Sequence, residues 1–129
     1  MCFTGGLVLA LMADPFVTAP VMCQPALPLK PFGDKSGLGV SPEELKAAKD
    51  RKIPVLALRF TGDTICSENR IERLRNEFGE CFRFIPVEPP ADKPDAHSII
   101  TEEWTRNPNQ SIRDALDAVV RFLKSQSAS

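Results

Sequence analysis

Three side chains suited to nucleophilic chemistry occur along the chain in the order Cys2, Asp63 and His97. A thiol that starts a helix and lies beside an imidazole ionises near neutral pH and can attack a carbonyl carbon. In such a site His97 accepts the thiol proton, while Asp63 bonds the second ring nitrogen and fixes the tautomer. The backbone N–H of Phe3 would stabilise the oxyanion that develops on the carbonyl. These residue types therefore predict acyl transfer through a cysteine nucleophile.

The segments around these residues predict an α/β fold with a mostly parallel sheet and flanking helices. Residues 53–60 (IPVLALRF) are continuously apolar, which is typical of a parallel strand covered on both faces. Residues 3–13 are apolar on nearly every side and predict a buried helix that stops at Asp14-Pro15. The remaining predicted elements are short strands at 21–23 and 82–87 and helices at 41–51, 67–78 and 111–124, with a proline-rich loop up to Gly39.

The order of these elements would bring the three reactive side chains to one edge of the sheet. Asp63 directly follows the apolar run, and His97 lies in the loop after residues 82–87. Loops at the carboxyl ends of parallel strands form the functional edge of α/β sheets. We therefore expect Asp63 and His97 to meet there, with Cys2 at the start of the first helix.

Length, charge and cysteine spacing narrow the function class. The chain has 129 residues, 16 basic against 17 acidic side chains and a net charge of −1, which predicts one domain and argues against nucleic acid as a partner. The first basic residue is Lys30, and the apolar run near the start is too short to span a bilayer, so neither a signal segment nor a membrane partner is expected. The four cysteines form no CxxC pair and only one histidine is present, so we expect no metal, reduced thiols and a cytoplasmic location.

Four segments resemble the dienelactone hydrolase family of the α/β-hydrolase superfamily. They are the turn MCFTGG at 1–6, VMCQPALP at 21–28, LRFTGD at 58–63 and AHSIITE at 96–102. The resemblance implies an α/β-hydrolase fold, a Cys2–Asp63–His97 triad, the Phe3 N–H as an oxyanion donor and no cofactor. It implies a small carboxylic ester or lactone as the substrate.

The resemblance covers only the carboxyl-terminal half of that family's fold. The family's opening strands and the loop with a second oxyanion donor would precede Met1, so we expect a single truncated domain over residues 1–129 that lacks the N-terminal strands. Better-known members carry an arginine four residues after the histidine, where this chain has Thr101. The alternative function is a catalytically inactive half-domain that associates with itself or with another chain, such as a missing N-terminal half, through its exposed sheet edge.

Simpler roles exist for the same residues. Asp63 could form an Asx-turn or cap the following helix, and a lone loop histidine such as His97 is often only solvated. Arg59 sits inside a predicted strand, and either a structural ion pair or an anionic substrate would explain it. Cys23 and Cys66 lie near the same sheet edge as spare thiols. A Cys2 activated by its own α-amine is a further alternative, although that mechanism belongs to antiparallel folds.

Overall fold

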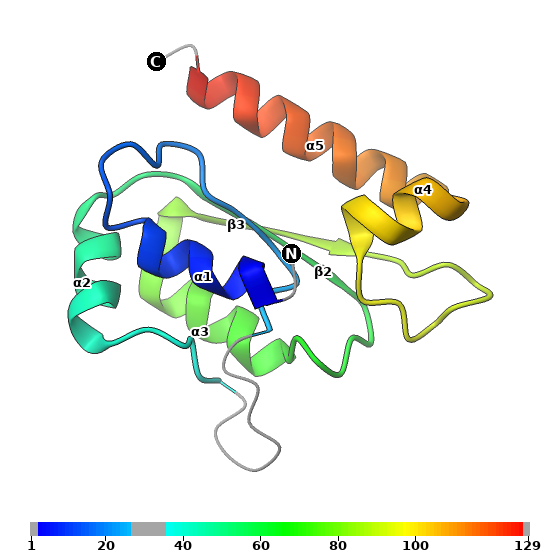
Figure 1. Cartoon of the computed structure of the whole chain (residues 1–129), viewed down its shortest axis with the longest axis horizontal. Helices are drawn as coiled ribbons and strands as arrows, with labels where there is room; N and C mark the ends of the chain where they lie inside the picture. Colours follow the sequence, from blue (N-terminus) through cyan, green and yellow to red (C-terminus); the bar gives the residue numbers. More distant parts are fainter. Residues whose placement is uncertain (1–2, 27–35, 128–129) are drawn as a thin grey trace.

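The computed structural model describes residues 3–26 and 36–127, which build a three-stranded parallel sheet with helices on both faces (Figure 1). The strands are β1 (Val21–Cys23), β2 (Val55–Phe60) and β3 (Phe82–Val87), in the spatial order β1-β2-β3. The main helices are α1 (Phe3–Leu11), α2 (Pro42–Asp50), α3 (Glu68–Phe78) and α5 (Gln110–Ser127). The predicted class, α/β with a parallel sheet and flanking helices, is confirmed for this part of the chain.

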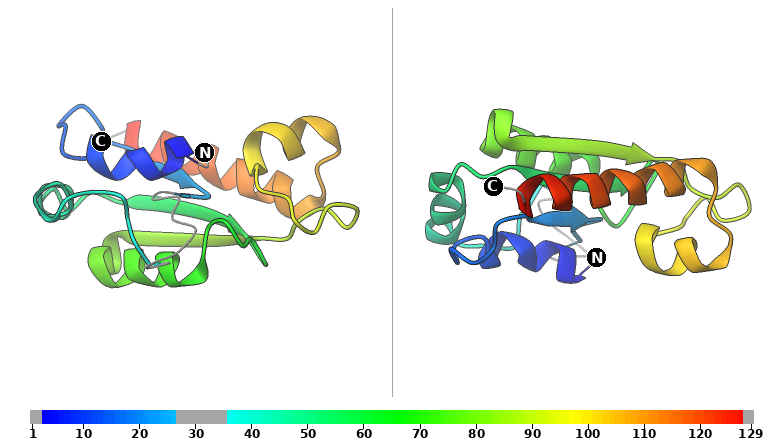
Figure 2. Two further views of the ribbon diagram at one scale, coloured as in Figure 1. Left: turned by 60° about the horizontal axis from the view of Figure 1, so that its bottom comes forward. Right: turned by 90° about the horizontal axis from the view of Figure 1, so that it is seen from above.

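The central strand β2 is buried on both faces, as its continuous apolar run predicted. Val55 and Ala57 contribute to a core that also contains residues of α1, α2 and α3. Leu56, Leu58 and Phe60 point to the other face and pack with residues of α5. Figure 2 shows α5 on one side of the sheet and α3 on the other. Each strand therefore separates two apolar layers, and its carboxyl end is left to the loops.

The bounds of two helices follow from local signals in the sequence. Ser41 accepts a hydrogen bond from the Glu44 N–H, and the Glu44 carboxylate accepts one from the Ser41 N–H, so a full capping box starts α2. Gly79 ends α3 with a φ of 52°, in the left-handed region that a residue without Cβ adopts at little cost.

Arginine side chains hold the loops in place by donating hydrogen bonds to main-chain carbonyl oxygens of the loop residues. Arg51, just after α2, donates hydrogen bonds of 2.6 to 3.1 Å to the carbonyl oxygens of four residues after α1, namely Met12, Asp14, Pro15 and Val17. Arg70 of α3 is buried and donates to the carbonyl oxygens of Pro25 and Gly37, at 2.8 Å each. These contacts anchor the segment after α1 and the segment after β1.

The structure differs from the sequence-based expectations in several places, and one is the last helix, which continues past the expected end at 124 to Ser127. The first two residues of the predicted strand 53–60 lie outside β2, where Pro54 has no N–H to donate to a ladder. A π-helical turn at Ile99–Glu103 and a short helix α4 (Trp104–Arg106) follow His97 and were not predicted. Helix α1 is less enclosed than its composition suggested, because Leu9 is buried, as is Met12 directly after the helix, while Leu7 and Leu11 are 40% and 59% exposed. In the ranges the structure describes, no helix is both long and apolar enough to cross a bilayer.

Candidate active site

Asp63 lies in the tight turn that follows β2, with its side chain only 2% exposed. Gly62 provides the turn with a φ of 79°, and the Asp63 N–H donates to the Phe60 carbonyl oxygen at 3.2 Å. Its carboxylate oxygen Oδ1 accepts the N–H groups of Ile65 and Cys66, at 2.8 and 3.0 Å. Asp63 therefore does form the Asx-type turn, and this contact occupies one of its two oxygens.

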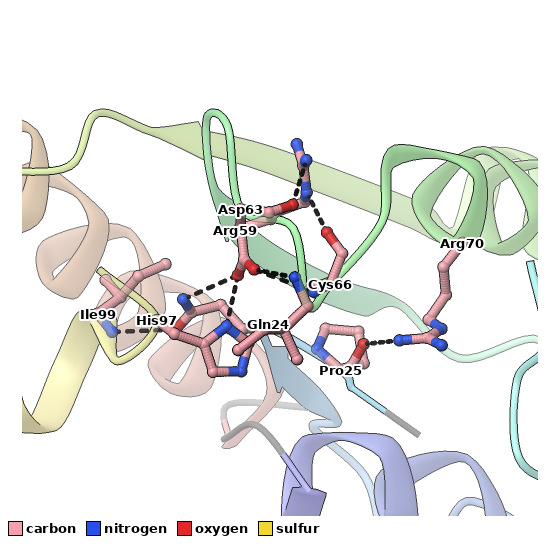
Figure 3. A network of polar contacts seen from close by, with 9 residues as sticks. Gln24, Pro25, Arg59, Asp63, Cys66, Arg70, His97 and Ile99 are labelled. Carbon is pink, nitrogen blue, oxygen red and sulfur yellow. Dashed lines mark hydrogen bonds and ion pairs between the residues drawn. The ribbon is translucent and has the colours of Figure 1, made fainter. Parts of the chain in front are cut away.

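The second carboxylate oxygen of Asp63 contacts His97. The distance from His97 Nδ1 to Asp63 Oδ2 is 2.6 Å, so the two sequence-predicted side chains meet at the carboxyl edge of the sheet (Figure 3). The other ring nitrogen, His97 Nε2, is buried and has no hydrogen-bond partner among the described residues. His97 is thus a largely enclosed imidazole, with a side chain 16% exposed, rather than a solvated surface group.

Hydrogen bonds keep Asp63 ionised in spite of its burial. Burial by itself favours the neutral carboxyl and raises the pKa, but hydrogen bonds from His97, Cys66 and Ile65 together with the nearby imidazole outweigh it. The net result is a pKa of Asp63 below its ordinary value. An ionised carboxylate can only accept, so the shared proton belongs on His97 Nδ1, and in the neutral form of the imidazole Nε2 is then the acceptor.

Gln24, directly after β1, completes the polar cluster and was not singled out from the sequence. Its Nε2 donates to Asp63 Oδ2 at 3.3 Å, and its Oε1 accepts the Ile99 N–H at 3.0 Å. The side chain is fully buried, and the backbone has a φ of 51°. The sequence offers one signal for Gln24: it is a polar residue that directly follows a short apolar strand, at the carboxyl edge of the predicted sheet.

Helix α1 lies close to this cluster through its first turn. A Cβ at Gly5 would lie 2.7 Å from the Cys23 carbonyl oxygen and 3.6 Å from Pro25 Cα, and these two residues flank Gln24. The helix begins at Phe3, so the Phe3 N–H belongs to the first-turn donors that lack an intrahelical acceptor. Cys2, the predicted nucleophile, lies outside the described residues.

Arg59 bonds main-chain carbonyl groups among the described residues and not the carboxylate that a structural ion pair would provide. Its guanidinium donates to two main-chain carbonyl oxygens, those of Cys66 at 2.5 Å and Asp63 at 2.9 Å. It therefore clamps the turn that carries Asp63.

The spare thiols near the site are buried. Cys66 is fully enclosed, and burial raises the pKa of Cys23 to about 11, which keeps that thiol protonated near neutral pH. Cys81 is half-buried at the end of a 3₁₀ turn (Gly79–Cys81) away from the cluster. Within residues 3–26 and 36–127, no three His, Cys, Asp or Glu side chains gather as metal ligands.

Comparison of the chain with protein-family models, curated proteins and solved structures finds no match.

Proposed function

We propose that this chain is a hydrolase of the dienelactone hydrolase type that cleaves a small carboxylic ester or lactone. Cys2 is the nucleophile, His97 the general base and Asp63 the residue that orients the imidazole. The observation that carries the proposal is the state of His97, with Nδ1 held by a buried carboxylate and Nε2 buried without a partner in the described part of the chain.

The unpartnered nitrogen favours a catalytic role because it carries an energetic cost. A buried acceptor without a hydrogen bond loses about 1–3 kcal/mol of solvation, and native structures rarely leave one. A purely structural histidine would be expected to use both nitrogens. Here Nε2 is free to accept a proton, and Asp63 fixes the tautomer that makes this possible.

The position of the cluster also supports a nucleophile at Cys2. Residue 2 directly precedes Phe3, where α1 begins, and the first turn of α1 packs on the residues that flank Gln24. Gln24 in turn contacts Asp63. A thiol at a helix start gains from the helix dipole, which favours the thiolate. The nucleophile–acid–histidine order on a parallel sheet matches the order in α/β hydrolases.

The reaction proceeds in two halves. In the first, His97 Nε2 takes the Cys2 proton, the sulfur attacks the ester carbonyl carbon and the Phe3 N–H donates to the oxyanion. The intermediate collapses, the alkoxide leaves with the proton from Nε2, and a thioester remains on Cys2. In the second half, water gives a proton to Nε2 and attacks the thioester. The thiolate leaves, regains that proton and releases the carboxylic acid.

The chain lacks the arginine that binds a substrate carboxylate in the better-known members of the dienelactone hydrolase family. Thr101 stands at that position, is exposed and has its Oγ1 2.9 Å from Ser98 Oγ. A hydroxyl provides no positive charge for a carboxylate. We therefore propose a substrate whose recognition does not depend on a carboxylate bound at residue 101.

The test is acylation of the full chain by an activated aryl acetate, followed by mapping of the acetyl group. We expect it on Cys2, and we expect Cys2→Ala to abolish the burst of aryl alcohol. His97→Ala should slow acylation by about 10²-fold or more, because it removes the general base. Cys81→Ala, which removes a half-buried thiol outside the cluster, is the matched control and should react normally. A Cys2→Ala variant that reacts at the wild-type rate would overturn the proposal.

A second candidate function is association with another chain through the β1 edge of the sheet, and the open edge of β1 among the described strands supports it. Strand β1 pairs only with β2 among the described strands, and α1 beside it exposes Leu7 and Leu11. An open strand edge next to apolar side chains is a pairing surface. Light scattering at micromolar concentration should then show a complex that Leu11→Lys dissociates. A monodisperse wild-type monomer would contradict this candidate.

A further inference from the structure

Gln24 combines two features that a structural role alone does not require. It is a non-glycine residue at a φ of 51°, in the left-handed region that side chains rarely adopt. It also precedes Pro25, and a residue before proline is normally confined to extended backbone. Unusual backbone of this kind persists where the surroundings enforce it, and it concentrates at functional sites.

The surroundings hold Gln24 from both sides. Its N–H donates to the Leu58 carbonyl oxygen of β2 at 2.8 Å, which extends the sheet ladder by one residue. The next residue, Pro25, accepts a buried hydrogen bond from Arg70 and lies under Gly5 of α1. The left-handed turn is therefore fixed by the sheet, α3 and α1 together.

With this backbone conformation, both the nitrogen and the oxygen of the Gln24 side-chain amide form hydrogen bonds. Nε2 donates to the Asp63 oxygen that also contacts His97, and Oε1 accepts the N–H of Ile99, two residues after His97. The partners fix the orientation of the amide, because a flipped amide would set two acceptors against each other at Asp63 and two donors at Ile99. Gln24 thus joins the loop of Asp63 to the segment of His97 (Figure 3).

We propose that Gln24 is a positioning residue of the site, whose buried amide holds the Asp63 carboxylate and the His97 segment in a single arrangement. It keeps Asp63 Oδ2 directed at His97 Nδ1, while His97 Nε2 stays buried without a partner among the described residues. The chemical use of that arrangement rests on the proposed hydrolase function, whereas the arrangement itself can be measured without any substrate.

An amide suits this position better than any other side chain of its size. It supplies one donor and one acceptor without adding charge. A carboxylate at residue 24 would face Asp63 with a like charge, and a methionine would leave both Asp63 and the Ile99 N–H with one contact fewer.

The imidazole ¹⁵N spectrum of the full chain provides the test, because the sequence contains one histidine. In the wild type we expect the Nδ1–H tautomer of neutral His97, with a protected Nδ1–H signal. In Gln24→Met we expect a mixture of tautomers, loss of the protected signal and acylation slowed by about 10²-fold. Gln110→Met is the matched control, since it removes an exposed Gln–Asp hydrogen bond of 2.8 Å to Asp114 and should change neither signal nor rate.

Gln24→Glu provides a second test if Gln24→Met does not fold. Two carboxyl groups in contact cannot both ionise easily, so the introduced carboxyl and Asp63 should hold a shared proton. Carboxyl ¹³C resonances should then show the pKa of Asp63 raised by about one unit or more, where one unit is about 1.4 kcal/mol. Titration of Asp63 at its wild-type pH in this variant would show that the two side chains are not in contact.

The outcomes separate this inference from the proposed function. An unchanged His97 spectrum in a folded Gln24→Met variant overturns the positioning role, whatever the chain hydrolyses. A changed spectrum in a chain that acylates no ester at Cys2 supports the positioning role and refutes the hydrolase.

Discussion

Gly5→Ala is the substitution that most directly tests how α1 is placed against the site. The added Cβ would lie 2.7 Å from the Cys23 carbonyl oxygen, whereas ordinary contact begins at 3.4 Å. Helix α1 and β1 would therefore have to separate by about 0.7 Å, and neither atom belongs to a flexible side chain. The first turn of α1, which carries Phe3, would move with them.

The sign of the change in stability shows whether the steric contact outweighs the higher helix propensity of alanine. Overpacking of this kind costs about 1–3 kcal/mol, while alanine gains about 1 kcal/mol over glycine inside a helix. We expect a net loss of up to about 2 kcal/mol in the free energy of unfolding, measured by urea denaturation. Acylation of Cys2 should slow by about 10²-fold, because the proposed nucleophile directly precedes the first turn of α1 and would shift when that turn moves.

A control for helix propensity is available on α2. Ala47 is exposed in the middle of that helix, so Ala47→Gly measures the alanine–glycine difference without a steric contact. If Gly5→Ala instead stabilised the protein by the amount that Ala47→Gly destabilises it, the close approach of α1 to β1 would be refuted.

Two further substitutions test the ionisation of the site and the arginine clamps. The pKa of Asp63 is lower in the folded chain than in the unfolded one, so its stabilising contribution is complete above the unfolded pKa of about 3.9 and is lost as the pH falls through the folded value. Urea midpoints between about pH 6 and pH 2 should therefore fall more steeply in the wild type than in Asp63→Asn, and equal slopes would contradict this reasoning. Arg51→Lys replaces a fork that reaches four carbonyl oxygens by a single ammonium, and we expect a loss of about 1–3 kcal/mol in urea denaturation, with Lys52→Arg as a control that should change little.

The sheet could be predicted from the sequence because its signals are local. The run IPVLALRF is apolar at every position but Pro54 and Arg59, which only burial on both faces explains, and β2 is buried in that way. The contact between Asp63 and His97 followed from topology alone, since each residue comes after a parallel strand.

The features that were missed depend on contacts between distant segments. Gln24 belongs to the site because of a left-handed turn and partners 39 and 75 residues away, and no periodic pattern encodes either. The π-helical turn after His97 is held by Lys93, which pairs with Glu102 and Glu103 at 2.8 and 2.7 Å. Propensity favoured a fully buried α1, but only one side of that helix finds a partner in the described part of the chain.

The clamps by Arg51, Arg59 and Arg70 hold their loops independently of the side chains that the loops carry. All three bind main-chain carbonyl oxygens, and every amino acid carries that group. Loop side chains outside the cluster of Gln24, Asp63 and His97 can therefore be exchanged while the loops keep their places. Loss of one arginine, by contrast, releases a whole segment at once, so we expect substitutions at these three arginines to be tolerated less well than substitutions of the loop side chains that they hold in place.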